Sequence, residues 1–174
     1  ISKAHLLNIA HTDIKPGNIL VNKEGVVKVL DFGIAKLIHG DSTSQHQKMV
    51  QRYLRALSIN YASPEQLKND KLTLQTDQYS LAILLHQLLT ERTPFSRDKH
   101  AINEIIEQVI KGQVPSLISQ VNSLKAKWQL TGDINHIVKK ALSPSPEQRY
   151  KTLTDFSSDL YRYLKKRPIS IKSH

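Results

Sequence analysis

Two short apolar runs near the start of the chain, residues 19–21 and 26–30, flank a polar link at residues 22–25. Both runs are rich in β-branched side chains and the link contains a glycine, so the pattern predicts a β-hairpin. Residues 1–8 have the pattern of the last turns of a helix.

Helical patterns dominate the rest of the chain. Residues 77–90 are apolar on nearly every side, which is typical of a buried helix. Apolar residues recur at helical spacing in 101–110, 133–142 and 153–164, which predicts amphipathic helices, with Asp133 as the N-cap of its segment. Residues 101–110 should pack in the core through one face of the helix. That face contains Ile102, Ile105, Ile106 and Val109. The pattern as a whole predicts an α+β fold that is mainly α-helical.

Composition sets the broad class of the protein. The 174 residues are 39% hydrophobic, which is enough to bury a core in one domain or part of one. Cysteine is absent, which excludes disulfide and thiolate chemistry. The net charge of +10 favours acidic partners, among them nucleotide phosphates, nucleic acid and anionic membranes. The longest apolar stretch, around Leu81–Leu89, is too short to span a bilayer.

Candidate chemistry gathers around the predicted hairpin. The hairpin brings Asn18, before its first strand, close to Asp31, after its second. An amide oxygen and a carboxylate that converge in this way form the hard-oxygen site that Mg²⁺ prefers. Asp13, five residues before Asn18, is placed to accept a proton from an attacking hydroxyl, and Lys15 is a cation for a transferring phosphoryl group.

Residues 34–62 form a long and mostly irregular stretch, which in a compact domain is usually functional or mobile. Between Phe32 and Pro64 the only acidic residue is Asp41. The turn cluster within this stretch has two interpretations, phosphoacceptor residues or a solvated Ser/Thr-rich turn, and its hydroxyl residues are Ser42, Thr43 and Ser44.

The spacing D-x-K-x-x-N at residues 13–18, followed by D-F-G at 31–33, resembles the catalytic loop and metal-binding motif of protein kinases. The S-P-E-Q motif at 63–66 resembles the end of the activation segment in bacterial eukaryotic-like Ser/Thr kinases, and 77–82 resembles D-x-W-S-x-G of their central helix. The resemblance covers essentially the whole chain but only the C-terminal lobe of that family. It implies a partial kinase domain at 1–168 and a basic tail or linker at 169–174.

The resemblance also implies roles for single residues. Asp13 is expected to be the catalytic base and Lys15 to contact the γ-phosphate of ATP. Asn18 and Asp31 are expected to hold Mg²⁺, and Leu20 to form the floor of the adenine pocket.

Further roles concern support of the site. His11 and Phe32 are expected to pack together, and Asp77 to anchor the backbone of the catalytic loop. Arg149 is expected to form a buried ion pair with Glu65.

One position departs from the family pattern. Thr12 stands where the family has an arginine that pairs with a phosphorylated activation loop. We therefore expect activity that does not depend on phosphorylation of the activation segment. Ser58 stands at the place of the substrate-loop threonine, and Leu57 replaces the glycine beside it.

The sequence contains no G-x-G-x-x-G loop, no strand lysine of the V-A-I-K type and no hinge for adenine, so the N-terminal lobe is absent from these residues. We expect ATP and a protein with a Ser/Thr acceptor as partners, a cytoplasmic location, no nucleic acid, and membrane contact only through segments outside this chain. Two alternatives remain: a catalytically inactive binding or regulatory fragment, and a kinase of small molecules that shares the two aspartates and the asparagine.

Overall fold

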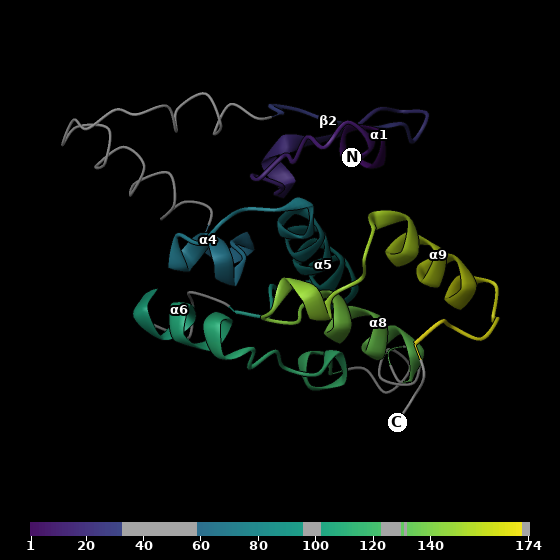
Figure 1. The fold of residues 1–174 in the computed structure, drawn as a ribbon. Coiled ribbons are helices and arrows are strands. Elements are labelled where there is room, and N and C mark those ends of the chain that lie inside the picture. Colours follow the sequence, from purple (N-terminus) through teal and green to yellow (C-terminus); the bar gives the residue numbers. More distant parts are fainter. Residues whose placement is uncertain (33–58, 96–101, 123–129, 131, 172–174) are drawn as a thin grey trace.

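Helix α5 (Leu74–Thr90) runs through the middle of the structure, and the other elements pack around it (Figure 1). The computed structural model describes residues 1–32, 59–95, 102–122, 130 and 132–171. The N-terminal helix and the hairpin lie on one side of α5, and α6 and α8 lie on the other (Figure 1). The fold is therefore mainly helical with one small sheet, as predicted.

The elements follow the predicted order along the chain. The longer ones, besides α5, are α1 (Ser2–Leu6), β1 (Ile19–Val21), β2 (Val27–Val29), α4 (Pro64–Lys68), α6 (Ile102–Lys111), α8 (Asp133–Ala141) and α9 (Leu153–Leu164). The short 3-10 turns are η1 (Pro16–Asn18), η2 (Ile59–Tyr61), η3 (Leu117–Gln120) and η4 (Pro146–Gln148).

The predicted hairpin is confirmed. Strands β1 and β2 pair antiparallel with Ile19 opposite Val29 and Val21 opposite Val27. The polar link closes because Gly25 adopts φ +78°, a left-handed conformation that glycine tolerates at low cost, and its N–H donates to the Asn22 carbonyl at 3.0 Å.

Helix α5 is buried along most of its length, as its sequence predicted. Tyr79, Ala82 and Ile83 are essentially inaccessible to solvent. Thr73 is the N-cap of the helix, and its N–H donates to Thr76 Oγ1 at 3.1 Å. Glu91 ends it in the left-handed conformation with φ +62°, and its N–H donates to the Gln87 carbonyl. Because α5 is rigid and central, side chains on its first turn can hold distant loops in place.

Helix α8 contacts both α5 and α9, and α6 contacts α4. Two details differ from the sequence prediction. The N-cap of α8 is Gly132, with φ +67°, and Asp133 is the first helical residue, where its charge still favours the helix dipole. Ile102 is 45% exposed because it is the first residue of α6, whereas Ile105 and Val109 are buried as expected.

The hydrophobic core lies between α5, α6, α8 and α9. Its larger members, all nearly inaccessible to solvent, are Tyr79, Ile83, Phe95, Ile105, Leu117, Ile137 and Leu142. Among the described residues, no helix is both long enough and apolar enough to cross a membrane.

Candidate active site

The loop between α1 and β1 brings three of the predicted site residues together. Asp13 Oδ2 accepts hydrogen bonds from Lys15 Nζ at 2.7 Å and from Asn18 Nδ2 at 3.0 Å. Asn18 Nδ2 also donates to the Asp13 carbonyl at 2.8 Å. The 3-10 turn η1 begins at Pro16, which suits the first position of a helical turn, and folds the chain back so that Asn18 reaches Asp13. The three side chains therefore form one polar cluster.

The cluster is open to solvent on one side. The Asp13 and Lys15 side chains are 39% and 29% exposed, whereas Asn18 is buried. Charge-assisted bonds from a cation and an amide orient the carboxylate of Asp13 before any ligand arrives. The arrangement suits a base that must meet a hydroxyl group from solution.

Asp31 follows strand β2 at the same end of the hairpin. The Leu30 N–H donates to the Asn18 carbonyl at 2.8 Å, so Asp31 lies one residue beyond the partner of Asn18. Asp31 has φ +60°, a left-handed conformation that turns the chain away from the strand, and its side chain is exposed. The structure thus places the backbone of Asp31 next to the Leu30–Asn18 hydrogen bond, at the end of the hairpin that carries Asn18.

The donor groups fit Mg²⁺ bound in part by phosphates. Asn18 Nδ2 faces Asp13, so the amide oxygen Oδ1 points away from that carboxylate. Asn18 and Asp31 together offer a metal ion one amide oxygen and one carboxylate oxygen. In the described part of the chain no group of three or more His, Cys, Asp or Glu residues suits a metal ion. A hard cation that keeps waters and takes phosphate oxygens needs only one or two protein ligands, which matches this set.

His11 and Phe32 are in contact, as predicted, with ring centroids 4.7 Å apart. His11 Nε2 lies 2.7 Å from the Leu30 carbonyl and the Asp13 N–H lies 3.3 Å from His11 Nδ1. Because a carbonyl only accepts, Nε2 carries the proton and Nδ1 accepts, which is the neutral imidazole. His11 therefore joins the catalytic loop to the end of strand β2.

Asp77 anchors the backbone of the loop between α1 and β1, which confirms its predicted role. Its carboxylate is fully buried and accepts the backbone N–H groups of His11 and Thr12, each at 2.7 Å. His5 Nε2 from α1 lies 2.8 Å from the same carboxylate. Thr12 has φ +66°, which is strained for a β-branched residue, and such strain persists only where the surroundings fix the backbone.

Gln66 holds the next peptide group of the loop, at the Thr12 carbonyl, a contact that the sequence did not predict. Gln66 Nε2 donates to the Thr12 carbonyl at 2.7 Å. The same side chain accepts the Ser63 N–H at Oε1, and the Gln66 N–H donates to Ser63 Oγ, so Gln66 also completes the capping box of α4. The S-P-E-Q motif predicts the N-terminal cap of α4, but it does not predict the hydrogen bond from Gln66 to Thr12.

Glu65 and Arg149 form the predicted buried ion pair. Two parallel hydrogen bonds of 2.8 Å join the carboxylate to the guanidinium group, and both residues are less than 5% exposed. Burial by itself raises the pKa of Glu65, but the hydrogen bonds and charge of Arg149 outweigh it and hold that pKa below its usual value. Thr76 Oγ1 also donates to Glu65, at 2.9 Å. The pair fixes the start of α4 to the first turn of α5 and to η4.

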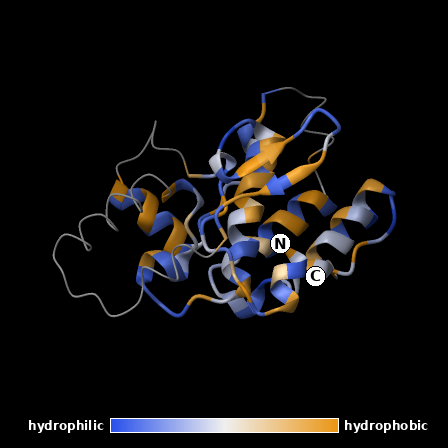
Figure 2. Cartoon of the chain, turned by 90° about the horizontal axis from the view of Figure 1, so that it is seen from above, coloured by the Kyte–Doolittle hydropathy of each residue, from blue (hydrophilic) through white to orange (hydrophobic). Residues whose placement is uncertain are grey.

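The two strands of the hairpin are mostly hydrophobic (Figure 2), and Leu20, Val21 and Val27 in them are exposed. Leu20, predicted to contact adenine, is 53% exposed, and this role stays a prediction. The predicted phosphoacceptors Ser42, Thr43 and Ser44, and the substrate-loop positions Leu57 and Ser58, lie outside the described residues.

Comparison with known proteins identifies relatives over nearly the whole chain. The family model described as "Protein kinase domain" matches residues 1–161. A probable serine/threonine-protein kinase of Clostridium perfringens is 37% identical over 173 residues, which is 98% of this chain and 23% of the relative. The probable serine/threonine-protein kinase PknB of Bifidobacterium longum is 32% identical over 92% of this chain and 22% of its own length.

Serine/threonine-protein kinase PknB of Mycobacterium tuberculosis is also 32% identical, over 91% of this chain and 24% of its own length. The chain therefore spans about a quarter of the length of the curated relatives it matches. The predicted resemblance to bacterial Ser/Thr kinases is confirmed for this part of their length.

Proposed function

Because the chain belongs to the protein kinase family, we propose that it supplies the substrate side and the metal ligands of a Ser/Thr protein kinase active site. The reaction is transfer of the γ-phosphoryl group of ATP to a Ser or Thr hydroxyl of a protein. The observation that carries the proposal is the cluster of Asp13, Lys15 and Asn18 on a loop anchored by Asp77.

Asp13 acts on the acceptor hydroxyl. Lys15 and Asn18 orient its carboxylate, which is partly open to solvent and can accept the hydroxyl proton. The ammonium group of Lys15 lies beside this carboxylate, where it neutralises charge on the phosphoryl group in transit. Catalysis of this kind consists mostly of positioning and charge stabilisation.

Asn18 and Asp31 would hold Mg²⁺, through the amide oxygen that points away from Asp13 and through the exposed carboxylate. When bound, the ion would neutralise charge on the ATP phosphates. The contribution of the chain is to fix both ligands at one end of a paired hairpin.

The nucleotide-covering motifs of the family are not among these 174 residues. We therefore propose that the isolated chain does not turn over and that activity belongs to a longer protein that includes those motifs. A binding or regulatory role without activity is the alternative. The complete set Asp13, Lys15, Asn18 and Asp31 favours the active interpretation.

The test is a phosphorylation assay with Mg-ATP and a set of Ser-, Thr- and Tyr-containing peptides, followed by identification of the phosphorylated residue. The full-length protein should label Ser or Thr, and Asp31→Ala should remove labelling in the presence of Mg²⁺. Label on Tyr, on a small molecule alone, or unchanged label in Asp31→Ala would contradict the proposal. The isolated chain should give no label with the same peptides.

A further inference from the structure

The segment that follows α9 folds back onto that helix. Residues 167–171, here called the C-terminal strap, are held by Ser170, whose N–H and Oγ donate to the two carboxylate oxygens of Asp159 at 2.8 and 2.7 Å. Asp159 lies on α9 and is only 1% exposed. Ile169 and Ile171 pack against the hydrophobic core. Residues 167–171 are thus held against this surface.

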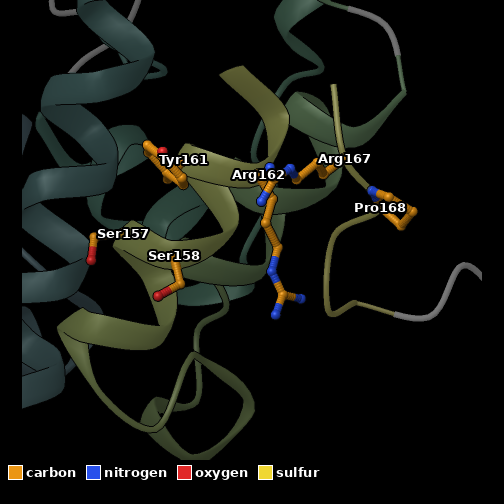
Figure 3. Close-up of a pocket in the computed structure, with 6 residues that line it drawn as sticks. All are labelled: Ser157, Ser158, Tyr161, Arg162, Arg167 and Pro168. Atoms are coloured by element: carbon orange, nitrogen blue, oxygen red, sulfur yellow. The ribbon is translucent and has the colours of Figure 1, made fainter. Parts of the chain in front are cut away.

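The strap and α9 line a pocket of about 600 Å³ that is open to solvent (Figure 3). It is lined from α9 by Ser157, Ser158, Tyr161 and Arg162, and from the strap by Arg167 and Pro168. The lining therefore contains two guanidinium groups, hydroxyl groups and no carboxylate.

The charge around the pocket is strongly positive. The Lys165 ammonium group lies 5.7 Å from the ring centroid of Tyr161, which adds a third cation near the rim. Asp159 on α9 forms an ion pair with Arg162, with one carboxylate oxygen 3.9 Å from the guanidinium group. That carboxylate is buried and also accepts hydrogen bonds from Ser170 and Tyr150. Its charge offsets part of the charge of Arg162 and, among the described residues, leaves Arg167 and Lys165 as the uncompensated cations around the pocket.

We propose that this pocket binds the phosphate group of a phosphorylated Ser or Thr side chain in a protein segment. Planar guanidinium groups pair with phosphate oxygens through parallel hydrogen bonds, and two of them match a dianion. The volume exceeds that of one phosphate group and admits a neighbouring side chain. The choice of ligand rests on the proposed function, whose product is a phosphorylated Ser or Thr.

The position of the two arginines leads to a prediction that is specific to this pocket. Arg162 is on α9, but Arg167 is on the strap, and the strap is held in place by Ser170. The Arg167 N–H also donates to the Arg162 carbonyl at 2.9 Å, and loss of the Ser170 hydroxyl removes one of the two Ser170–Asp159 bonds that hold the rest of the strap. Ser170→Ala should therefore weaken phosphate binding although Ser170 does not line the pocket.

The experiment measures binding and needs no catalytic turnover, so it is independent of a failure of the proposed kinase activity. The 174-residue chain is titrated with fluorescent peptides of sequence Ala-Gly-Ser-Gly-Ala, with and without phosphate on the serine, and with inorganic phosphate as competitor. We expect at least tenfold tighter binding of the phosphorylated peptide. Arg162→Gln and Arg167→Gln should each weaken it at least fivefold, and Ser170→Ala at least threefold.

Lys68→Gln on α4 is the matched control, because it removes the same charge from an exposed helix position and should change binding less than twofold. Circular dichroism melts of each variant confirm that the fold is intact. Equal affinity for both peptides, or losses in the arginine variants no larger than in Lys68→Gln, would overturn the proposal. So would binding only to phosphatidylserine vesicles, since that result assigns the basic surface to a membrane.

Discussion

The side-chain amide of Gln66 donates a 2.7 Å hydrogen bond to the carbonyl oxygen of Thr12, the residue before Asp13. Asp77 accepts the N–H of the same residue. The backbone of Thr12 is thus held on both sides, at its N–H and at its carbonyl, by side chains that lie more than fifty residues away in the sequence. In this chain a neutral hydrogen bond thus joins the loop that carries Asp13 to helix α4.

Gln66→Ala is expected to lower the kcat of the full-length kinase about tenfold, with the KM for ATP nearly unchanged, because Asp13 loses its position rather than its chemistry. Gln66→Glu should behave in the same way, since a carboxylate cannot donate to the Thr12 carbonyl. Steady-state kinetics check both variants, and hydrogen exchange in the isolated chain should show faster exchange at the Asp13 amide.

Gln75→Ala is the matched control, because that partly exposed glutamine side chain makes a single 3.2 Å bond to the Lys151 carbonyl. If Gln66→Ala and Gln75→Ala have equal kcat values, Gln66 does not position the loop.

Asp77→Ala is expected to lower the free energy of unfolding by at least about 3 kcal/mol, because it leaves two buried backbone N–H groups of the catalytic loop without an acceptor. Asp77→Asn should cost less, since one acceptor oxygen remains. Urea unfolding of the 174-residue chain measures both changes. The exposed Asp133→Ala on α8 serves as the control, and an equal loss in that variant would argue against the anchoring role.

Breaking the Glu65–Arg149 pair from either side is expected to cost about 3–5 kcal/mol of unfolding free energy, because each change leaves the other group buried and charged. The double variant Glu65→Gln/Arg149→Met should cost clearly less than the sum of the single variants. A double-mutant cycle by urea unfolding gives the coupling, and strict additivity would show that the two groups are independent.

The same pair predicts a pH dependence. The pKa of Glu65 is lower in the folded chain than its ordinary value of 4.5, so the stabilisation is complete above pH 4.5. It is lost as the pH falls through the folded pKa, because protonation removes the charge that Arg149 pairs with. In Glu65→Gln this component of acid destabilisation should be missing.

Much of the fold followed from local sequence patterns. The hairpin was predictable because apolar runs and a glycine link specify it within twelve residues, and α5 because a helix that is apolar on every side must be buried. The roles of Asp77 and Arg149 came from family spacing. The start of α8 was misplaced by one residue because Asp133 and Gly132 are both suitable near a helix N-terminus.

The contacts that sequence patterns could not give join residues far apart in the chain. No residue spacing or motif predicts the Gln66–Thr12 bond or the Ser170–Asp159 bonds. Both depend on how helices pack in three dimensions. Polar side chains such as these have the same local pattern whether they face solvent or a backbone partner.

The activation segment offers a test of what Thr12 implies. Simultaneous replacement of Ser42, Thr43 and Ser44 by alanine should leave full-length kinase activity nearly unchanged, because Thr12 carries no charge to pair with a phosphate. A loss of more than about tenfold would contradict this prediction. The assay compares the activity of phosphatase-treated protein with that of untreated protein.

The central claim is that Asp13 is the base of a Ser/Thr kinase, and one variant tests it most directly. Full-length Asp13→Asn keeps the size of the side chain and the bond from Lys15, but an amide cannot take the hydroxyl proton. Its kcat for peptide phosphorylation should fall at least about a hundredfold while the Kd for Mg-ATP stays within twofold. Undiminished phosphoryl transfer in Asp13→Asn would contradict the account.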